Sequence, residues 1–153
     1  MYRIERSQLV PRPLVEVFRF FEDAGNLEAI TPPYLRFKIL TPRPISMSAG
    51  TRIDYELSLF GIRFRWRTRI EAFEPNVRFV DVQERGPYRD WRHLHEFEEV
   101  PGGTRMRDVV EYELPFGPLG SAVHALFVRR SVERIFEHRR RCIAERYPTR
   151  IRT

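Results

Sequence analysis

The sequence lacks several features that would define its class at once. It contains a single cysteine, Cys142, which excludes an internal disulfide and a thiolate metal cluster. No apolar run approaches the ~20 residues that a transmembrane segment needs, and no signal peptide is recognisable. No nucleotide-binding glycine loop, GxSxG or GKS/T-type motif occurs, and Gly102-Gly103 is typical of a hairpin turn. Together these absences favour a cytoplasmic location.

Lysine is almost absent as well. Of the 27 basic residues only Lys38 is lysine, so the other 26 are arginine. The net charge of +6 would permit binding to nucleic acid or to an anionic membrane surface. Such a bias towards arginine more often reflects genome composition than function. We therefore expect no nucleic-acid partner, and keep a basic nucleic-acid or membrane-surface module only as an alternative.

The remaining composition is that of an ordinary globular protein. The 153 residues are 42% hydrophobic and 31% charged, which is enough to bury a core. We find no repeat or linker, and expect one domain over residues 1–153.

The first part of the chain predicts a strand followed by two helices. Residues 2–9 alternate between polar and apolar, which is typical of a strand. Over residues 14–21 apolar side chains recur at i, i+3, i+4 and i+7, which predicts a helix with one apolar face. A short second helix is expected over Asn26–Ile30, capped by Asn26 and stopped by the prolines that follow.

The middle of the chain predicts six strands: Phe37–Leu40, Thr51–Leu59, Ile62–Glu71, Arg78–Glu84, Trp91–Val100 and Thr104–Leu114. Hairpin-length connections imply an antiparallel meander. In the strand that begins at Ile62, four arginines alternate with apolar residues, so a slip by one residue would bury all four. Ion pairs with Asp54 and Glu56 on the preceding strand explain these arginines without a phosphate backbone.

The element order and three stretches carry a resemblance to a known family. The stretches are VFRFFEDAGNLEAITPP, FVDVQERGPYRDWRHLHEFEEV and TRMRDVVEYELPFGPLG. Over essentially the whole chain, the sequence resembles the START-like or Bet v 1-like SRPBCC superfamily of polyketide cyclases and lipid-transfer proteins, closest to its small bacterial ligand-binding members. The resemblance implies an α+β helix-grip fold: a curved, seven-stranded antiparallel sheet around a long C-terminal helix, with an internal cavity between them. Members include transporters, sensors and cyclases, so the fold does not decide the activity.

The closing helix, expected over Leu119–Tyr147, has an unusual apolar pattern. At 100° per residue one group of apolar residues lies nearly opposite the other. The first group is Leu119, Ala122, Val123, Leu126 and Phe127, and the second is Val128, Val132, Ile135, Phe136, Cys142 and Ile143. A straight helix on a sheet has one apolar stripe. We therefore predict a kink near Phe127–Arg130, with the first turns facing the cavity mouth or a partner.

Alternation in the later strands predicts a polar cluster inside the cavity. Trp91, His93, His95 and Phe97 share one face, and aromatic neighbours indicate that this face points inward. If the adjacent strands turn the matching faces inward, five polar side chains converge: Asp81, Gln83, His93, His95 and Asp108. In the opposite register, Val80 and Val82 would point inward in place of the two polar residues of their strand.

Three roles are open for this cluster. It could be a satisfied core network of hydrogen bonds, a recognition site for ligand oxygens, or a catalytic pair of His93 or His95 with Asp81 or Asp108. His-x-His with an aspartate is also a weak metal motif, and we assign neither a metal nor a cofactor. The inward aromatic residues Tyr55, Trp66 and Tyr112 either fill the core or stack on a flat ligand.

The sequence thus favours a binder of a hydrophobic small molecule, such as a lipid, an isoprenoid quinone or a polyketide-like aromatic. The alternative is a cyclase or dehydratase that uses the histidine–aspartate cluster. The predicted ligand-binding residues are Tyr55, Trp66, Asp81, Gln83, Trp91, His93, His95, Asp108, Tyr112 and Phe127.

Overall fold

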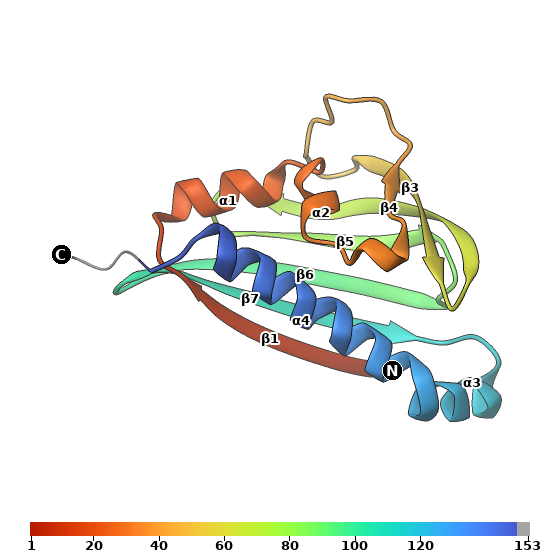
Figure 1. Cartoon of the computed structure of the whole chain (residues 1–153). Helices are drawn as coiled ribbons and strands as arrows, with labels where there is room; N and C mark the ends of the chain where they lie inside the picture. Colours follow the sequence, from red (N-terminus) through yellow and green to blue (C-terminus); the bar gives the residue numbers. More distant parts are fainter. Residues whose placement is uncertain (150–153) are drawn as a thin grey trace.

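The computed structural model describes residues 1–149 and contains a curved sheet that faces a long C-terminal helix (Figure 1). Its seven strands are β1 (Tyr2–Val10), β2 (Lys38–Ile39), β3 (Arg52–Leu59), β4 (Ile62–Glu74), β5 (Arg78–Arg85), β6 (Asp90–Val100) and β7 (Gly103–Glu113). They are antiparallel and lie in the order β1-β7-β6-β5-β4-β3-β2, so β1 closes the sheet against β7. The predicted meander and helix-grip architecture are confirmed.

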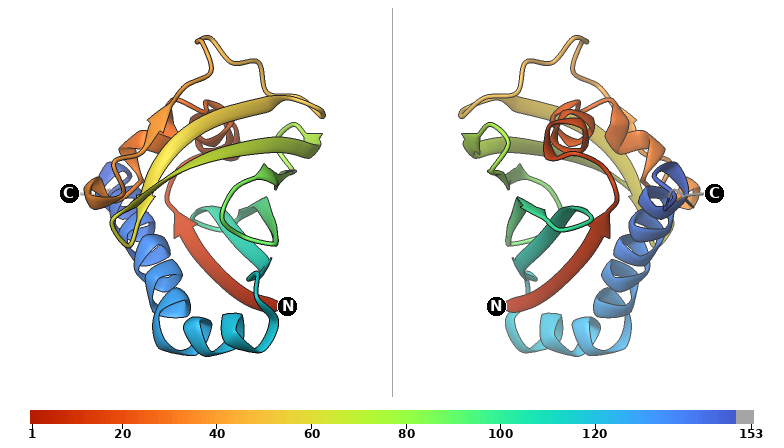
Figure 2. Two further views of the ribbon diagram at one scale, coloured as in Figure 1. Left: turned by 90° about the vertical axis from the view of Figure 1, so that its right-hand side faces the viewer. Right: turned by 90° about the vertical axis from the view of Figure 1, so that its left-hand side faces the viewer.

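The helices lie on the concave side of the sheet. They are α1 (Leu14–Glu22), α2 (Asn26–Ala29), the 3-10 helix η1 (Pro33–Leu35), α3 (Gly117–Val123), the π-helix η2 (His124–Val128) and α4 (Arg129–Arg146). Figure 2 shows α4 along the open side of the curved sheet. Within residues 1–149, none of these helices has the length and apolar character needed to cross a membrane.

One local prediction for the segment after α1 needs correction. Gly25, not Asn26, precedes α2, and the Asn26 side chain instead donates to the carbonyl oxygen of Phe20 at 2.9 Å. The prolines at 32 and 33 do more than stop a helix, because they begin η1. That turn buries Leu35 beneath β3 and so adds to the wall of the interior.

The closing helix bends as the two apolar faces predicted. It begins at Gly117, and η2 interrupts its α-helical pattern next to the predicted kink. The chain runs in clearly different directions in α3 and α4 (Figure 2). A π-turn inserts an extra residue into the ladder of hydrogen bonds and is a known cause of helix kinks without proline or glycine. Leu126 and Phe127, within η2, remain 68% and 58% exposed.

The arginine face of β4 pairs with acids on the neighbouring strands. Arg63 lies 2.7 Å from Glu56, and Arg67 lies 2.8 Å from Asp54, its partner across the β3–β4 ladder. The predicted cross-strand ion pairs are therefore present on the outer face of the sheet.

The buried side chains form three clusters around the interior. One joins α1 to β5, β6 and β7, and Phe18 meets Phe97 edge to face at 5.1 Å within it. A second packs Val132 and Phe136 of α4 against the β7 end of the sheet. The third contains Leu57 and Trp66 of β3 and β4. The space between these clusters is the candidate site.

Candidate functional site

A largely apolar cavity of about 200 Å³ lies between the sheet, α4 and the segment from α1 to η1. Residues from the segment between α1 and η1 line one end of the cavity: Phe20, Phe21, Ala24, Leu27, Ile30 and Leu35. On the sheet side Ile53, Leu57, Ile70 and Phe79 line it, and α4 contributes Val132, Ile135 and Phe136.

Ladder register explains why four polar side chains meet on the wall formed by β5, β6 and β7. Asp81 lies opposite His93 across the β5–β6 ladder, and His95 lies opposite Asp108 across the β6–β7 ladder. Because side chains alternate along a strand, His93 and His95 point to the same side. His93 and His95 are 6% and 5% exposed, so the cluster is buried. The inward register predicted for these four residues is confirmed.

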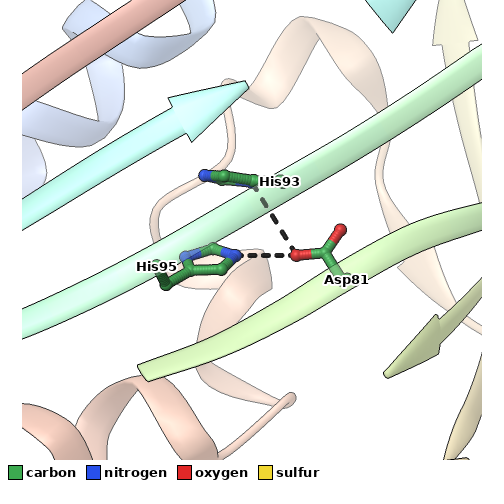
Figure 3. Close-up of side chains that lie close together, drawn as sticks. All are labelled: Asp81, His93 and His95. Atoms are coloured by element: carbon green, nitrogen blue, oxygen red, sulfur yellow. Dashed lines mark hydrogen bonds and ion pairs between the residues drawn. The ribbon is translucent and has the colours of Figure 1, made fainter. Parts of the chain in front are cut away.

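The four side chains form a closed set of contacts. His95 donates from Nε2 to Asp81 Oδ2 at 2.7 Å, and His93 donates from Nε2 to Asp108 Oδ1 at 2.9 Å. The second nitrogen of each ring faces the other carboxylate: His93 Nδ1 lies 3.8 Å from Asp81 Oδ2, and His95 Nδ1 lies 3.3 Å from Asp108 Oδ1. Figure 3 shows the two contacts of Asp81. Each imidazole thus lies between two carboxylates.

Arg139 on α4 completes the cluster, and sequence reasoning missed it. Its side chain is almost fully buried, and Nη2 lies 3.4 Å from Asp108 Oδ1 and 3.3 Å from His95 Nδ1. The guanidinium also lies over the ring of Phe21, 5.2 Å from its centroid. A signal was present, because Arg139 falls at helical spacing in the buried stripe that contains Val132, Phe136 and Ile143.

The surroundings shift the pKa values of the two histidines in opposite directions. Burial, reinforced by His95, lowers the pKa of His93 to about 4. Burial also opposes a charge on His95, but hydrogen bonds with Asp108 and Asp81 outweigh it and raise the pKa of that ring. Burial likewise opposes ionisation of Asp108, yet the Arg139 charge and the two histidines hold the pKa of its carboxyl well below the usual range. His95 therefore takes up a proton more readily than His93, beside two carboxylates and Arg139.

Aromatic side chains line the rest of the sheet wall. Tyr55 stacks on Trp66 with ring centroids 5.8 Å apart, and Trp91 meets Trp66 edge to face at 5.4 Å. Thr68 satisfies the polar atoms of Tyr55 and Trp66, since its hydroxyl accepts from Trp66 Nε1 at 3.1 Å and lies 3.3 Å from the Tyr55 hydroxyl. The aromatic faces are therefore fixed before any ligand arrives. Tyr88, which was not predicted, lines the same end.

Six of the ten predicted ligand-binding residues line the cavity: Tyr55, Trp66, Asp81, Trp91, His93 and His95. Four do not. Asp108 lies behind the histidines, on a small pocket between β1 and α4. Gln83 turns into the β5–β6 loop, where it donates to the carbonyl oxygen of Tyr88 at 2.8 Å and accepts from the amide of that residue.

The other two predicted residues lie near the bend of the closing helix. Tyr112 is fully buried and forms a 2.6 Å hydrogen bond with His124, away from the cavity lining. Phe127 lies on the exposed side of η2. The expectation that the first turns of the closing helix face the cavity mouth is therefore not met by this side chain.

Comparison with known proteins gives the family. Residues 10–139 match the family model described as polyketide cyclase / dehydrase and lipid transport. The chain belongs to this family, as the resemblance in the sequence implied. No curated protein matches it.

Solved structures share the fold at low sequence identity. Protein CV1439 from Chromobacterium violaceum is 15% identical with a TM-score of 0.73, over 95% of this chain and 96% of that one. TTHA0849 from Thermus thermophilus is 20% identical with a TM-score of 0.66, over 95% and 99% of the two chains. Ara h 8.0201 is 16% identical with a TM-score of 0.64, over 94% and 98%. At these identities the likeness concerns the fold alone.

Proposed function

We propose that the protein binds a compact hydrophobic small molecule that carries an oxygen-containing polar group, in the cavity between the sheet and α4. One observation carries the proposal: the cavity is apolar and aromatic along most of its wall, yet Asp81, His93, His95 and Arg139 gather on one part of it. Small-molecule sites commonly combine apolar walls with a few polar groups that orient the ligand.

The size of the cavity narrows the ligand class. Its volume of about 200 Å³ is below the roughly 300–1,000 Å³ that is usual for ligand pockets. The stacked pair of Tyr55 and Trp66 and the edge of Trp91 favour a flat molecule. Of the ligand classes predicted from the sequence, a polyketide-like aromatic or a quinone ring therefore fits better than a lipid with two acyl chains.

The polar group of the ligand has a donor available to it. Arg139 Nε is buried and has no hydrogen-bond partner within residues 1–149. A buried donor left unpaired costs about 1–3 kcal/mol, so a ligand oxygen that accepts from it would bind more tightly. A carbonyl, hydroxyl or carboxylate oxygen meets this requirement.

The test begins with the protein as purified. We expect mass spectrometry of its organic extract to show a co-purifying aromatic or quinone-like compound, and a fluorescent apolar probe to bind with one site per chain. Ala24 lines the cavity, and Ala24→Phe should fill part of it and weaken the probe at least about tenfold, or ~1.4 kcal/mol. Ala122→Phe places the same side chain on the exposed surface of α3 and should leave the affinity unchanged. Equal probe affinities in the Ala24→Phe and Ala122→Phe variants, or no probe binding to the wild type, would contradict the proposal.

A pair of ligands with the same carbon skeleton tests the polar end. We expect 2-naphthol to bind more tightly than naphthalene by at least about tenfold, because a site built to pair a ligand hydroxyl discriminates against the analogue that lacks it. In the Arg139→Met variant this preference should shrink while the affinity for naphthalene persists. An unchanged preference for 2-naphthol would show that Arg139 does not recognise the ligand hydroxyl.

The second candidate function is acid–base catalysis of the cyclase or dehydratase type. The buried 2.7 Å contact between His95 Nε2 and Asp81 Oδ2, directly on the cavity wall, supports it. A positioned acid or base typically contributes about 10²–10⁴-fold to a rate. Turnover of an aromatic polyketide-type substrate should then be lost in His93→Ala and His95→Ala variants that still fold. Turnover that survives in both variants would contradict this assignment.

A further inference from the structure

Three ligand-type atoms on the cavity wall are spaced as the ligands of one metal ion. One carboxylate oxygen of Asp81 and one ring nitrogen each of His93 and His95 lie within 4.8 Å of one another (Figure 3). Two ligands at about 2.1 Å from a tetrahedral ion lie about 3.4 Å apart. The distances from Asp81 Oδ2 to His95 Nε2 and to His93 Nδ1, 2.7 and 3.8 Å, lie on either side of that value.

We propose that Asp81, His93 and His95 bind one divalent transition-metal ion of the Zn²⁺ or Fe²⁺ kind. The ligand atoms are Asp81 Oδ2, His93 Nδ1 and His95 Nε2. Two imidazoles and a carboxylate form a mixed nitrogen and oxygen set, which suits these ions better than Mg²⁺ or Ca²⁺, since the latter prefer oxygen alone. The three residues come from two adjacent strands, which fix their positions through the ladder register.

The groups behind the histidines support this choice of atoms. Asp108 accepts from His93 Nε2 at 2.9 Å, and its same oxygen lies 3.3 Å from His95 Nδ1. A histidine that binds a metal usually donates its other ring N–H to a carboxylate or carbonyl, which fixes the ring and its tautomer. Asp108 can serve both rings in this way and leave the lone pairs of His93 Nδ1 and His95 Nε2 towards Asp81.

Arg139 has a defined place in the same arrangement. Its Nη2 lies 3.4 Å from Asp108 Oδ1, which keeps that carboxylate ionised while it accepts from both rings. Nη2 also lies 3.3 Å from His95 Nδ1, so with a proton on this nitrogen the guanidinium interacts with Asp108 alone. The ion would take the place of the hydrogen bond between His95 Nε2 and Asp81 Oδ2.

The site would keep one position open towards the cavity. Asp81, His93 and His95 all line the cavity, whereas Asp108 lies behind them. Three protein ligands with an open fourth position are typical of metal sites that contact a substrate or ligand. The bound ion would then contact the oxygen of a cavity ligand directly. Ion binding itself does not depend on the proposed function, because it requires only the wall of the cavity.

The experiment uses the full chain, stripped with a chelator and titrated with Co²⁺ while visible absorption is recorded. We expect one Co²⁺ per chain, with d–d bands of a four- or five-coordinate ion, and displacement by Zn²⁺. Asp81→Asn and His93→Gln should each weaken Co²⁺ by more than the 10–100-fold typical of an outer partner, and Asp108→Asn by about 10–100-fold. Circular dichroism identifies variants that keep the fold, and His93→Gln replaces Asp81→Asn if the latter does not fold.

A second pair of metal-binding side chains supplies the control. On α4, His138 Nε2 lies 3.3 Å from Cys142 Sγ, one helical turn away, and could bind Co²⁺ adventitiously. The double variant His138→Gln/Cys142→Ser should retain the wild-type Co²⁺ spectrum and affinity. Three results overturn the proposal: no stoichiometric binding, loss of binding in this double variant, or wild-type affinity in a folded Asp81→Asn or His93→Gln variant. Probe binding to the stripped protein is measured separately, so failure of the metal site leaves the test of the cavity intact.

Discussion

Histidine side chains are buried in two regions of this molecule. In one region they contact charged side chains, and in the other the contacts are with tyrosine. His93 and His95 meet two carboxylates and a guanidinium on the cavity wall. His124, which is 6% exposed at the helix bend, instead forms a hydrogen bond with the hydroxyl of Tyr112 and stacks on the ring of Tyr2, with ring centroids 3.4 Å apart.

Charge makes the difference between the two regions. Hydrogen bonds with carboxylates raise the pKa of His95 against the effect of burial, whereas burial and the nearby Arg129 lower the pKa of His124. The first region therefore holds compensated charges next to a cavity and can exchange a partner for a ligand or an ion. The second is an uncharged contact that attaches η2 to β1 and β7. We infer that one histidine region serves binding and the other holds the bend.

The largest effect that would test this contrast is expected from Asp108→Ala. The change removes one carboxylate and leaves Arg139 and two histidines without it. Breaking a buried ion pair from one side typically costs about 3–5 kcal/mol of unfolding free energy. Urea unfolding followed by circular dichroism, with a chelator present, measures the loss.

The matched control for that variant is Asp54→Ala on β3. Asp54 pairs with Arg67 on the outer face of the sheet, where both side chains are more than a third exposed. Solvent screening reduces such a pair to about 0–1 kcal/mol. Similar losses in the two variants would show that the inner cluster does not behave as a buried charge network.

Tyr112→Phe should have the next largest effect, and it acts on the uncharged region. The variant deletes the hydroxyl that lies 2.6 Å from His124 Nε2. A buried polar atom left without a partner costs about 1–3 kcal/mol. Tyr55→Phe is the control and should cost less, because Thr68 keeps its bond with Trp66. Probe and Co²⁺ affinities should stay at wild-type values in Tyr112→Phe, and a fall in either would connect the two regions.

The sequence alone predicted the cavity side of this contrast but not the His124 side, because alternation along a regular strand is local information. His93, His95 and Asp108 lie on β6 and β7, whose ladder is regular, and their inward placement followed from period two. Gln83 on β5 lies opposite Thr68, which lines the cavity, but hydrogen bonds with the backbone of Tyr88 hold its side chain in the β5–β6 loop. Such contacts depend on the conformation of a loop, so the pattern of the strand does not reveal them.

The helix side of the site was harder to predict. The two apolar faces of the closing helix correctly predicted its kink, but not which side of the bend would contact the cavity. The π-turn leaves Phe127 exposed and turns His124 inward instead. Arg139 was missed because only the apolar residues of the closing helix were assigned to faces, although Arg139 occupies a position of the buried stripe. Its burial depends on Asp108, which lies on a strand far away in the sequence.

The pH dependence of unfolding should show the sign of the His124 shift. Its pKa in the folded protein is lowered from 6.5, so the unfolded chain binds a proton more readily. The contribution is fully present above pH 6.5 and is lost as the pH falls from 6.5 through the lowered folded pKa. Between pH 7.5 and 5, the unfolding free energy of the wild type should therefore fall more steeply than that of His124→Gln. Parallel curves would mean that His124 titrates alike in both states.

The smallest effect is expected from Phe127→Ser, in the π-helix η2 of the same bend. Phe127 is exposed, and a surface change away from buried contacts usually alters unfolding free energy by less than about 0.5 kcal/mol. Probe affinity should also remain within about twofold, or ~0.4 kcal/mol, of the wild type. Urea unfolding and probe titration check both values. A clear loss of affinity with unchanged stability would mean that the Phe127 side chain contacts the bound ligand, and that this region takes part in binding after all.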